Sequence, residues 1–133
     1  MQFTRDEITE LKGKPNSTKL CWADFYNAKL ADFDMSQAVV YGSEFYGADL
    51  SHANLSHTNL SNVNFKNANL SNSNLNGAFL SEAKFHGADL SGADLSNAKM
   101  SGANLNQAKY DKDTKWPLGF DALGSGAILE KAA

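Results

Sequence analysis

The chain is poor in the residues on which ordinary folds depend. Its 133 residues include one Cys, two Pro, and only five Val and Ile together. The single Cys21 excludes an internal disulfide framework and a multi-cysteine metal site. So few β-branched residues argue against a conventional sheet protein. Because no long apolar run is present and no basic-then-apolar leader follows Met1, we expect no membrane span, no secretion signal and a cytoplasmic location.

A strong charge of either sign is also missing. The 15 acidic and 12 basic side chains leave a net charge of −3, and residues 18–110 carry eight acids against six Lys, a net of −2. A nucleic-acid interface needs a basic stripe or an Arg cluster, and the sequence has neither. We therefore expect no nucleic-acid partner and no membrane partner.

What the chain has in abundance is Ala, Leu, Asn and Ser, with 18, 15, 14 and 13 copies. Asn and Ser are poor residues for helix interiors, so the composition is wrong for a helical protein. The 15 Leu and eight Phe are nevertheless enough for a core, which excludes the signature of disorder. This combination indicates an internal repeat.

A period of five residues runs without a break from Thr18 to Tyr110 and gives 19 units. Each unit has a large apolar residue at what we call the central position. Two residues earlier lies a small position, which is Ala in 13 of 19 units. Five residues advance an α-helix by about 140° net, so these positions would form no helix face. In an extended segment residues two apart share a side, so both positions point inward.

The second residue after each centre predicts a corner. It is Gly or Asn in 11 of 19 units, and these residues tolerate the positive φ of a tight turn. Phe recurs at the centre every 20 residues, which indicates four units per coil and a stacked core ladder of Phe25, Phe45, Phe65 and Phe85. Nineteen units then make about 4.75 coils, a stack roughly 23 Å tall at a strand spacing of ~4.8 Å.

Units such as Ala48-Asp49-Leu50-Ser51 and Ala88-Asp89-Leu90-Ser91 resemble the A(D/N)LXX motif of the pentapeptide-repeat family. The resemblance extends over the whole repeat region. It implies an all-β solenoid, a right-handed quadrilateral β-helix of about four to five coils. The tail from Thr114 to Asp121 is similar to the segment that follows the repeats in cyanobacterial and plastid members.

Both ends of a solenoid need caps. Thr4 with Glu7 forms a capping-box pattern and Phe3 with Ile8 a hydrophobic staple, which together predict a short helix over residues 5–12. Gly13 is suited to end it. We expect an N-terminal capping helix and linker in 1–17, the repeat β-helix in 18–112 and a capping tail in 113–133. A short helix is predicted over 128–133. The apolar side chains expected to cover the C-terminal end are Trp116, Leu118, Phe120, Leu123, Ile128 and Leu129.

One unit departs from the size rule, because Phe33 occupies a small position. We expect a local bulge or a loosened first coil there, with a functional kink as the alternative.

No catalytic or metal chemistry emerges from the pattern. His52, His57 and His86 are the only imidazoles, and no two of them are 20 residues apart, so none would stack on another. No His and acid converge on Cys21 or a Ser, and a packed interior offers no cleft. We expect no catalytic residue, no metal, no cofactor and no enzyme activity.

A cluster of apolar and aromatic residues is predicted to face outward on one side of the stack. Such a cluster indicates a protein-contact surface; the alternative is that it packs under the N-terminal segment, Trp22 and Tyr26 above all. The residues are Val39, Tyr41 and Phe79 on one wall, Trp22 at its corner, and Tyr26 and Tyr46 on the next wall. The wall that carries Asp34, Asn54, Asn74 and Asp94 is predicted to be plain solvated surface.

These observations favour a non-enzymatic scaffold that contacts a protein whose identity the sequence does not give, as a monomer or weak homodimer. The alternative is the DNA mimicry of family members that bind DNA gyrase. DNA carries one charge per ~1.7 Å, so a mimic roughly 23 Å long needs about a dozen negative charges. The net charge of −2 in the repeats disfavours that alternative.

Overall fold

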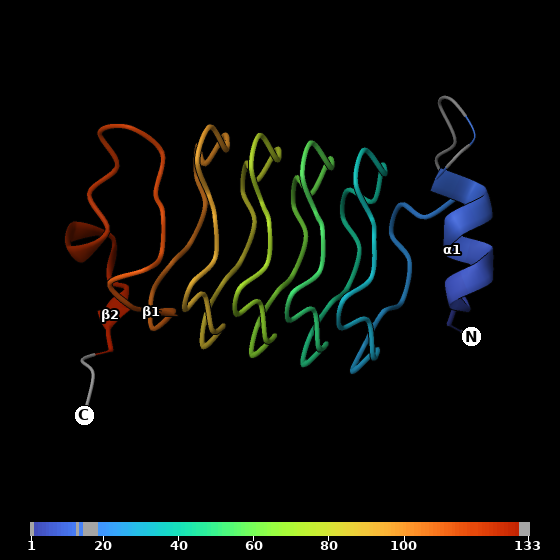
Figure 1. The fold of residues 1–133 in the computed structure, drawn as a ribbon, viewed down its shortest axis with the longest axis horizontal. Coiled ribbons are helices and arrows are strands. Elements are labelled where there is room, and N and C mark those ends of the chain that lie inside the picture. The colour runs from blue at the N-terminus through green and yellow to red at the C-terminus, as the bar shows by residue number, and fades with distance from the viewer. Residues whose placement is uncertain (1, 13, 15–18, 131–133) are drawn as a thin grey trace.

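The chain winds into a stack of coils with one helix at the N-terminal end and an irregular segment at the C-terminal end (Figure 1). The computed structural model describes residues 2–12, 14 and 19–130. Its elements are helix α1 (Arg5–Lys12), strand β1 (Lys109–Tyr110), a 3₁₀ helix (Leu123–Ser125) and strand β2 (Ile128–Leu129). Within the described residues, no helix is long and apolar enough to cross a membrane.

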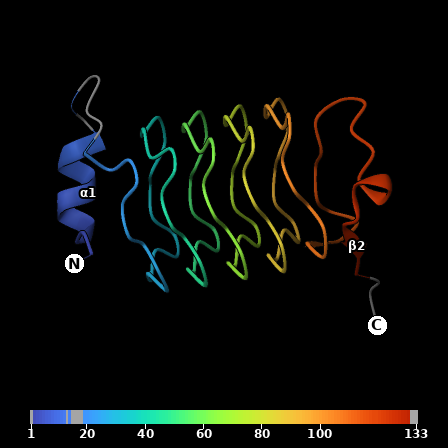
Figure 2. The ribbon, with the colours of Figure 1, turned by 180° about the vertical axis from the view of Figure 1, so that it is seen from behind.

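Successive coils are joined by parallel backbone bridges between residues 20 apart. The bridged residue of each unit is the one before the centre, and we call it the outward position. Bridged residues form four ladders, one on each wall of the stack, and Figure 2 shows the even spacing of the coils from behind. Wall 1 carries Val39, Asn59, Phe79 and Lys99; wall 2 Asp24, Glu44, Asn64, Lys84 and Asn104; wall 3 Lys29, Asp49, Asn69, Asp89 and Lys109; wall 4 Asp34, Asn54, Asn74, Asp94 and Lys115.

The corners have the left-handed backbone that the Gly and Asn pattern predicts. From Trp22 to Gln107, φ is positive at the second residue after every centre, at 55–73°, and 12 of these 18 residues are not Gly. In 17 of the corners the next small position donates its N–H to the carbonyl of the preceding centre at 2.9–3.3 Å. This hydrogen bond, with positive φ at the third residue alone, is the pattern of a type II turn.

The small and central positions form the core. Phe25, Phe45, Phe65 and Phe85 are fully buried. Their rings stack with centroid separations of 4.6, 5.5 and 5.2 Å along the column. The aromatic ladder therefore runs along the stack from the first coil to the fourth.

Helix α1 lies on the first coil. Thr4 N donates to Glu7 Oε1 at 2.8 Å and Glu7 N to Thr4 Oγ1 at 3.1 Å, the reciprocal bonds of a capping box. Ile8 is fully buried, and the Phe3 ring lies 6.1 Å from that of Phe25. Gly13 and Pro15 lie outside the described residues.

The prediction of a helix over 128–133 is wrong where the structure describes it. Ile128–Leu129 forms β2, which pairs in parallel with β1. The cause is the open edge of the last coil, because Ala108 O and Tyr110 O accept the N–H groups of Ile128 and Glu130, both at 2.7 Å. A helix would leave those carbonyls without partners. Residues 131–133 lie outside the described residues.

Aromatic rings, and not leucines, cover the C-terminal end. Trp116 is partly buried, with its ring 5.3 Å from that of Tyr110 and 5.1 Å from that of Phe120. Leu118 and Leu123 are exposed, so the expectation that they cover this end is wrong.

The last coil contains one extra residue, because Asp94 pairs with Lys115, 21 residues away, instead of 20. Asp111 lies in this coil. Its carboxylate accepts the N–H groups of Gly92 and Asp113, both at 3.0 Å. Burial acts to raise the pKa of Asp111, but these N–H groups and the Thr114 hydroxyl outweigh it, so the pKa lies below its usual value.

Phe33 causes no bulge. Its N–H donates to Leu30 O at 3.1 Å and its carbonyl accepts from Asn54 at 2.9 Å, as in every regular unit. The large ring fits because it belongs to the first coil, where α1 is its neighbour and the Arg5 guanidinium lies 5.4 Å from the ring centroid.

Candidate protein-contact surface

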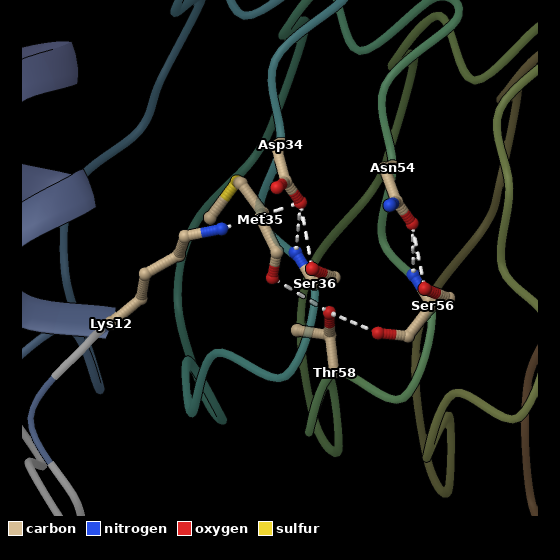
Figure 3. A network of polar contacts seen from close by, with 7 residues as sticks. All are labelled: Lys12, Asp34, Met35, Ser36, Asn54, Ser56 and Thr58. Carbon is tan, nitrogen blue, oxygen red and sulfur yellow. Dashed lines mark hydrogen bonds and ion pairs between the residues drawn. The ribbon is translucent and has the colours of Figure 1, made fainter.

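Most outward positions carry Asp or Asn, and the structure shows why. The side-chain oxygen accepts the N–H of the residue two further on, which satisfies a backbone donor at the corner. Asn54 Oδ1 accepts Ser56 N at 3.0 Å and Ser56 Oγ at 2.7 Å, and Asp34 binds Ser36 in the same way (Figure 3). An ordinary wall is thus polar and already internally hydrogen bonded.

Wall 1 departs from this rule at three of its four bridged positions, and two of the three are apolar. Val39 and Phe79 have no oxygen to accept the N–H at the corner. Val39 is half-buried, whereas Phe79 is 48% exposed. Asn59, between them, keeps the usual bond, accepting Ser61 N at 3.2 Å. Wall 1 therefore presents two apolar side chains two coils apart, with the exposed Lys99 beyond them.

Trp22 stands at the corner between walls 1 and 2. It has φ of 57° and is 72% exposed, the most exposed aromatic side chain of the described chain. Its ring meets that of Tyr41 edge-on with centroids 6.0 Å apart. It also lies over Gly42, where an added Cβ would be 2.4 Å from the indole carbons. Gly42 is the residue that leaves room for the ring.

The corner that holds Trp22 is built differently from the others. The buried Ser43 hydroxyl accepts Ala23 N at 3.1 Å and donates to Leu20 O at 2.6 Å. The hydroxyl thus stands between the two groups that bond directly in the other corners. Thr58 makes a related bond, donating to Met35 O at 3.0 Å, although the corner there stays closed (Figure 3).

Two stacked tyrosines extend the surface onto wall 2. The rings of Tyr26 and Tyr46 are 5.1 Å apart and inclined by 5°. Asn67 Nδ2 donates to the Tyr46 hydroxyl at 3.2 Å, which fixes the Tyr46 ring. Tyr26 is 48% exposed and Tyr46 half-buried.

The described part of the N-terminal segment does not bury Trp22 or Tyr26. Helix α1 lies over the end of the stack and not over walls 1 and 2 (Figure 1). The contact near the surface is from Gln2 Nε2, which donates to the main-chain carbonyl of Tyr26 and leaves the ring open. Of the six predicted residues, Trp22, Tyr26 and Phe79 are exposed. The structure brings Trp22 against Tyr41 and Tyr26 against Tyr46, whereas Phe79 lies two coils from Val39, with Asn59 between them.

The sequence matches the family model described as pentapeptide repeats, with eight copies, over residues 19–56, 43–81 and 80–109. The chain belongs to the pentapeptide repeat family. No match was found among the curated proteins.

Solved structures of other pentapeptide repeat proteins are similar. One from Nostoc PCC 7120 is 36% identical over 80% of this chain and 84% of its own, with a TM-score of 0.67. One from Cyanothece 51142, Rfr23, is 34% identical over 66% of this chain and 63% of its own, with a TM-score of 0.45. One from the Arabidopsis thaliana thylakoid lumen is 30% identical over 77% of this chain and 65% of its own, with a TM-score of 0.46.

This pentapeptide repeat protein shows no cluster of three metal-ligating side chains among its described residues. His52 and His57 are exposed corner residues and His86 is exposed on wall 2. Cys21, beside Trp22, is half-buried with its Sγ 3.5 Å from Val39 O, and burial raises the pKa of its thiol. A raised pKa disfavours the thiolate that nucleophilic chemistry needs.

Two residues that shape the Trp22 corner, Ser43 and Gly42, are not among the predicted surface residues. Ser43 occupies a small position of the repeat, and only its hydroxyl contacts mark its role at the Trp22 corner. Gly42 carries a signal that the sequence does contain, since it lies 20 residues after Trp22 and therefore directly next to it in the corner column.

Proposed function

We propose that this protein is a non-enzymatic interaction scaffold, a right-handed quadrilateral β-helix whose walls 1 and 2 contact another protein in the cytoplasm. It uses no cofactor and binds neither nucleic acid nor membrane. The observation that carries the proposal is the exposure of Phe79 on wall 1 and of Trp22 at the corner between walls 1 and 2, in a stack whose outward positions are mostly Asp, Asn and Lys.

The physical support begins with Phe79, which lacks the side-chain oxygen that a polar residue at this position would offer to the corner N–H. An Asn at position 79 would satisfy the corner N–H, as Asn59 does on the same wall. Exposed Trp and Tyr held by packed neighbours are typical of the central residues of protein interfaces, because they bury a large area with little loss of side-chain entropy. Trp22 on Gly42 and Tyr26 on Tyr46 have that arrangement.

Dispersed acids give the alternative of DNA mimicry no support. Asp49 and Asp89 are separated on wall 3 by Asn69, and Lys29 and Lys109 stand at the two ends of that ladder. A DNA mimic needs rows of carboxylates at the density of phosphates.

Site-specific photo-cross-linking tests the proposal. A photoreactive phenylalanine analogue at position 79 on wall 1 should capture one protein from a lysate of the source organism, and the same analogue at Asn69 on the opposite wall should not. Trp22→Ala should abolish that capture while the circular dichroism spectrum stays unchanged. Equal capture from both walls, or capture that survives Trp22→Ala, would contradict the proposed surface.

A further inference from the structure

The two ends of the stack present different backbone groups. The hydrogen bonds between the inner coils show which groups these are. Each inner coil receives backbone N–H groups from the coil before it, at the carbonyls of the outward position and of the residue after the centre. Examples are Asn27 N to Tyr46 O at 2.8 Å, Leu30 N to Asp49 O at 2.8 Å and Asp32 N to Ser51 O at 2.9 Å.

The first coil has the same carbonyls, and side chains from the N-terminal segment fill the place of the missing coil. Arg5 Nη2 donates to Lys29 O at 3.0 Å and to Ala31 O at 3.3 Å. Gln2 Nε2 donates to Tyr26 O. Lys29, Ala31 and Tyr26 lie 20 residues before Asp49, Ser51 and Tyr46, so these are the equivalent acceptors. The side chains thus imitate the donors of a preceding coil.

Apolar side chains of the N-terminal segment also take the place of a preceding coil. Ile8 is fully buried and Phe3 lies against Phe25, so α1 closes the end of the core as another coil would. Lys12 Nζ lies 3.3 Å from Asp34 Oδ1 and ties the end of the helix to wall 4 (Figure 3). Helix α1 covers an end that is shaped and hydrogen bonded to receive a coil.

The C-terminal end presents the complementary edge. Ile128 and Glu130 donate to the preceding coil, and alternate N–H groups of a strand point to opposite sides, so Leu129 N–H points away from the stack. In the inner coils the corresponding central residue, such as Leu30, donates its N–H to the next coil. The side chains of Ile128 and Leu129 are 42% and 40% exposed.

We propose that α1 masks a coil-docking edge whose occupant, once the helix is displaced, is the C-terminal edge of a second copy of this chain. The incoming Leu129 N–H would replace the donor that Arg5 supplies to Lys29 O, because wall 3 ends in β2 at one end and begins at Lys29 at the other. Such a contact joins different surfaces of identical chains and does not close, so it builds a head-to-tail stack. Helix α1 therefore sets the choice between a monomer and a filament.

The test combines a variant that uncaps one end with one that blocks the other. Arg5→Ala with Ile8→Asp removes the imitating donor and the buried anchor. The expected result is loss of the monomer boundary in sedimentation velocity, a mass that rises with concentration beyond a dimer, and particles of constant width in electron micrographs. Adding Leu129→Pro, which deletes the edge N–H, should restore the monomer. Thr9→Ala, at an exposed site of α1, is the matched control and should stay monomeric.

The controls keep the outcome decisive. Far-UV circular dichroism shows whether the coil survives, and if Ile8→Asp unfolds it, Arg5→Ala with Gln2→Ala removes the donors and leaves Ile8 in place. Oligomers that persist with Leu129→Pro would show that something other than the C-terminal edge docks, and would overturn the proposal. So would a folded, strictly monomeric variant whose α1 is cut readily by trypsin at Lys12.

Discussion

Replacing Phe65 with Ala tests whether the aromatic ladder holds the coils together. Phe65 is fully buried, with the rings of Phe45 and Phe85 at 5.5 and 5.2 Å on its two sides. Returning its apolar surface to water costs ~2 kcal/mol, and a cavity of roughly 100 Å³ at ~24 cal/mol per Å³ adds ~2 kcal/mol. We therefore expect the free energy of unfolding to fall by about 4 kcal/mol.

The matched control is Phe79→Ala, the same chemical change at an outward position. Because Phe79 is 48% exposed and leaves no internal cavity, its removal should change the free energy of unfolding by less than about 1 kcal/mol. Urea denaturation followed by far-UV circular dichroism measures both, with the slope checked for constancy across variants. A loss below about 2 kcal/mol for Phe65→Ala, or equal losses for the two variants, would refute the reasoning.

Two further predictions concern acid stability and the Trp22 corner. The lowered pKa of Asp111 means that its carboxylate stabilises the fold above the unfolded-state pKa of about 3.9, and that this contribution is lost as pH falls through the folded-state pKa. Thermal unfolding between pH 7 and acid should therefore show a smaller acid loss for Asp111→Asn than for the wild type, and equal losses would contradict the assignment. Gly42→Ala should displace the Trp22 ring and change the near-UV circular dichroism, whereas Gly119→Ala, with nothing within 4 Å of its added Cβ, should not. An unchanged Trp22 signal in Gly42→Ala would contradict the packing of the ring on Gly42.

The repeating part of the fold is predictable from the sequence because each recurring position of the five-residue unit meets one structural requirement. A five-residue period excludes a helix face, Gly and Asn mark the left-handed corners, and Phe at every fourth centre gives the number of walls. Non-glycine residues such as Trp22 and Glu82 occupy the same backbone region, so the corner is imposed by the ladder and not by local preference alone. The outward aromatic residues of the candidate surface follow from the same register.

What the sequence did not predict lies where the repeat stops. A small position is narrow only between two coils, so Phe33 in the first coil needs no bulge once α1 is its neighbour. The tail forms β2 because the last coil has backbone carbonyls that need hydrogen-bond donors. The hydrophobic pattern of the sequence does not indicate that need. The role of the Ser43 hydroxyl depends on a three-group contact across coils, and its residue type alone marks only a small side chain.

Because the bridges join residues 20 apart, an insertion or deletion in the repeats keeps the walls in register only when it is a multiple of 20 residues. A duplication of four units would add one rung to every ladder and leave all later residues on their own walls. Gain or loss of a single unit would turn everything downstream onto the neighbouring wall, so a unit inserted between Val39 and Phe79 would carry Phe79 and Lys99 together away from Val39. Only the last coil, whose pairings span 21 and 19 residues, absorbs an odd step. Recombination within the repeats therefore preserves a binding face only in whole turns, and that face drifts more readily by substitution than by insertion.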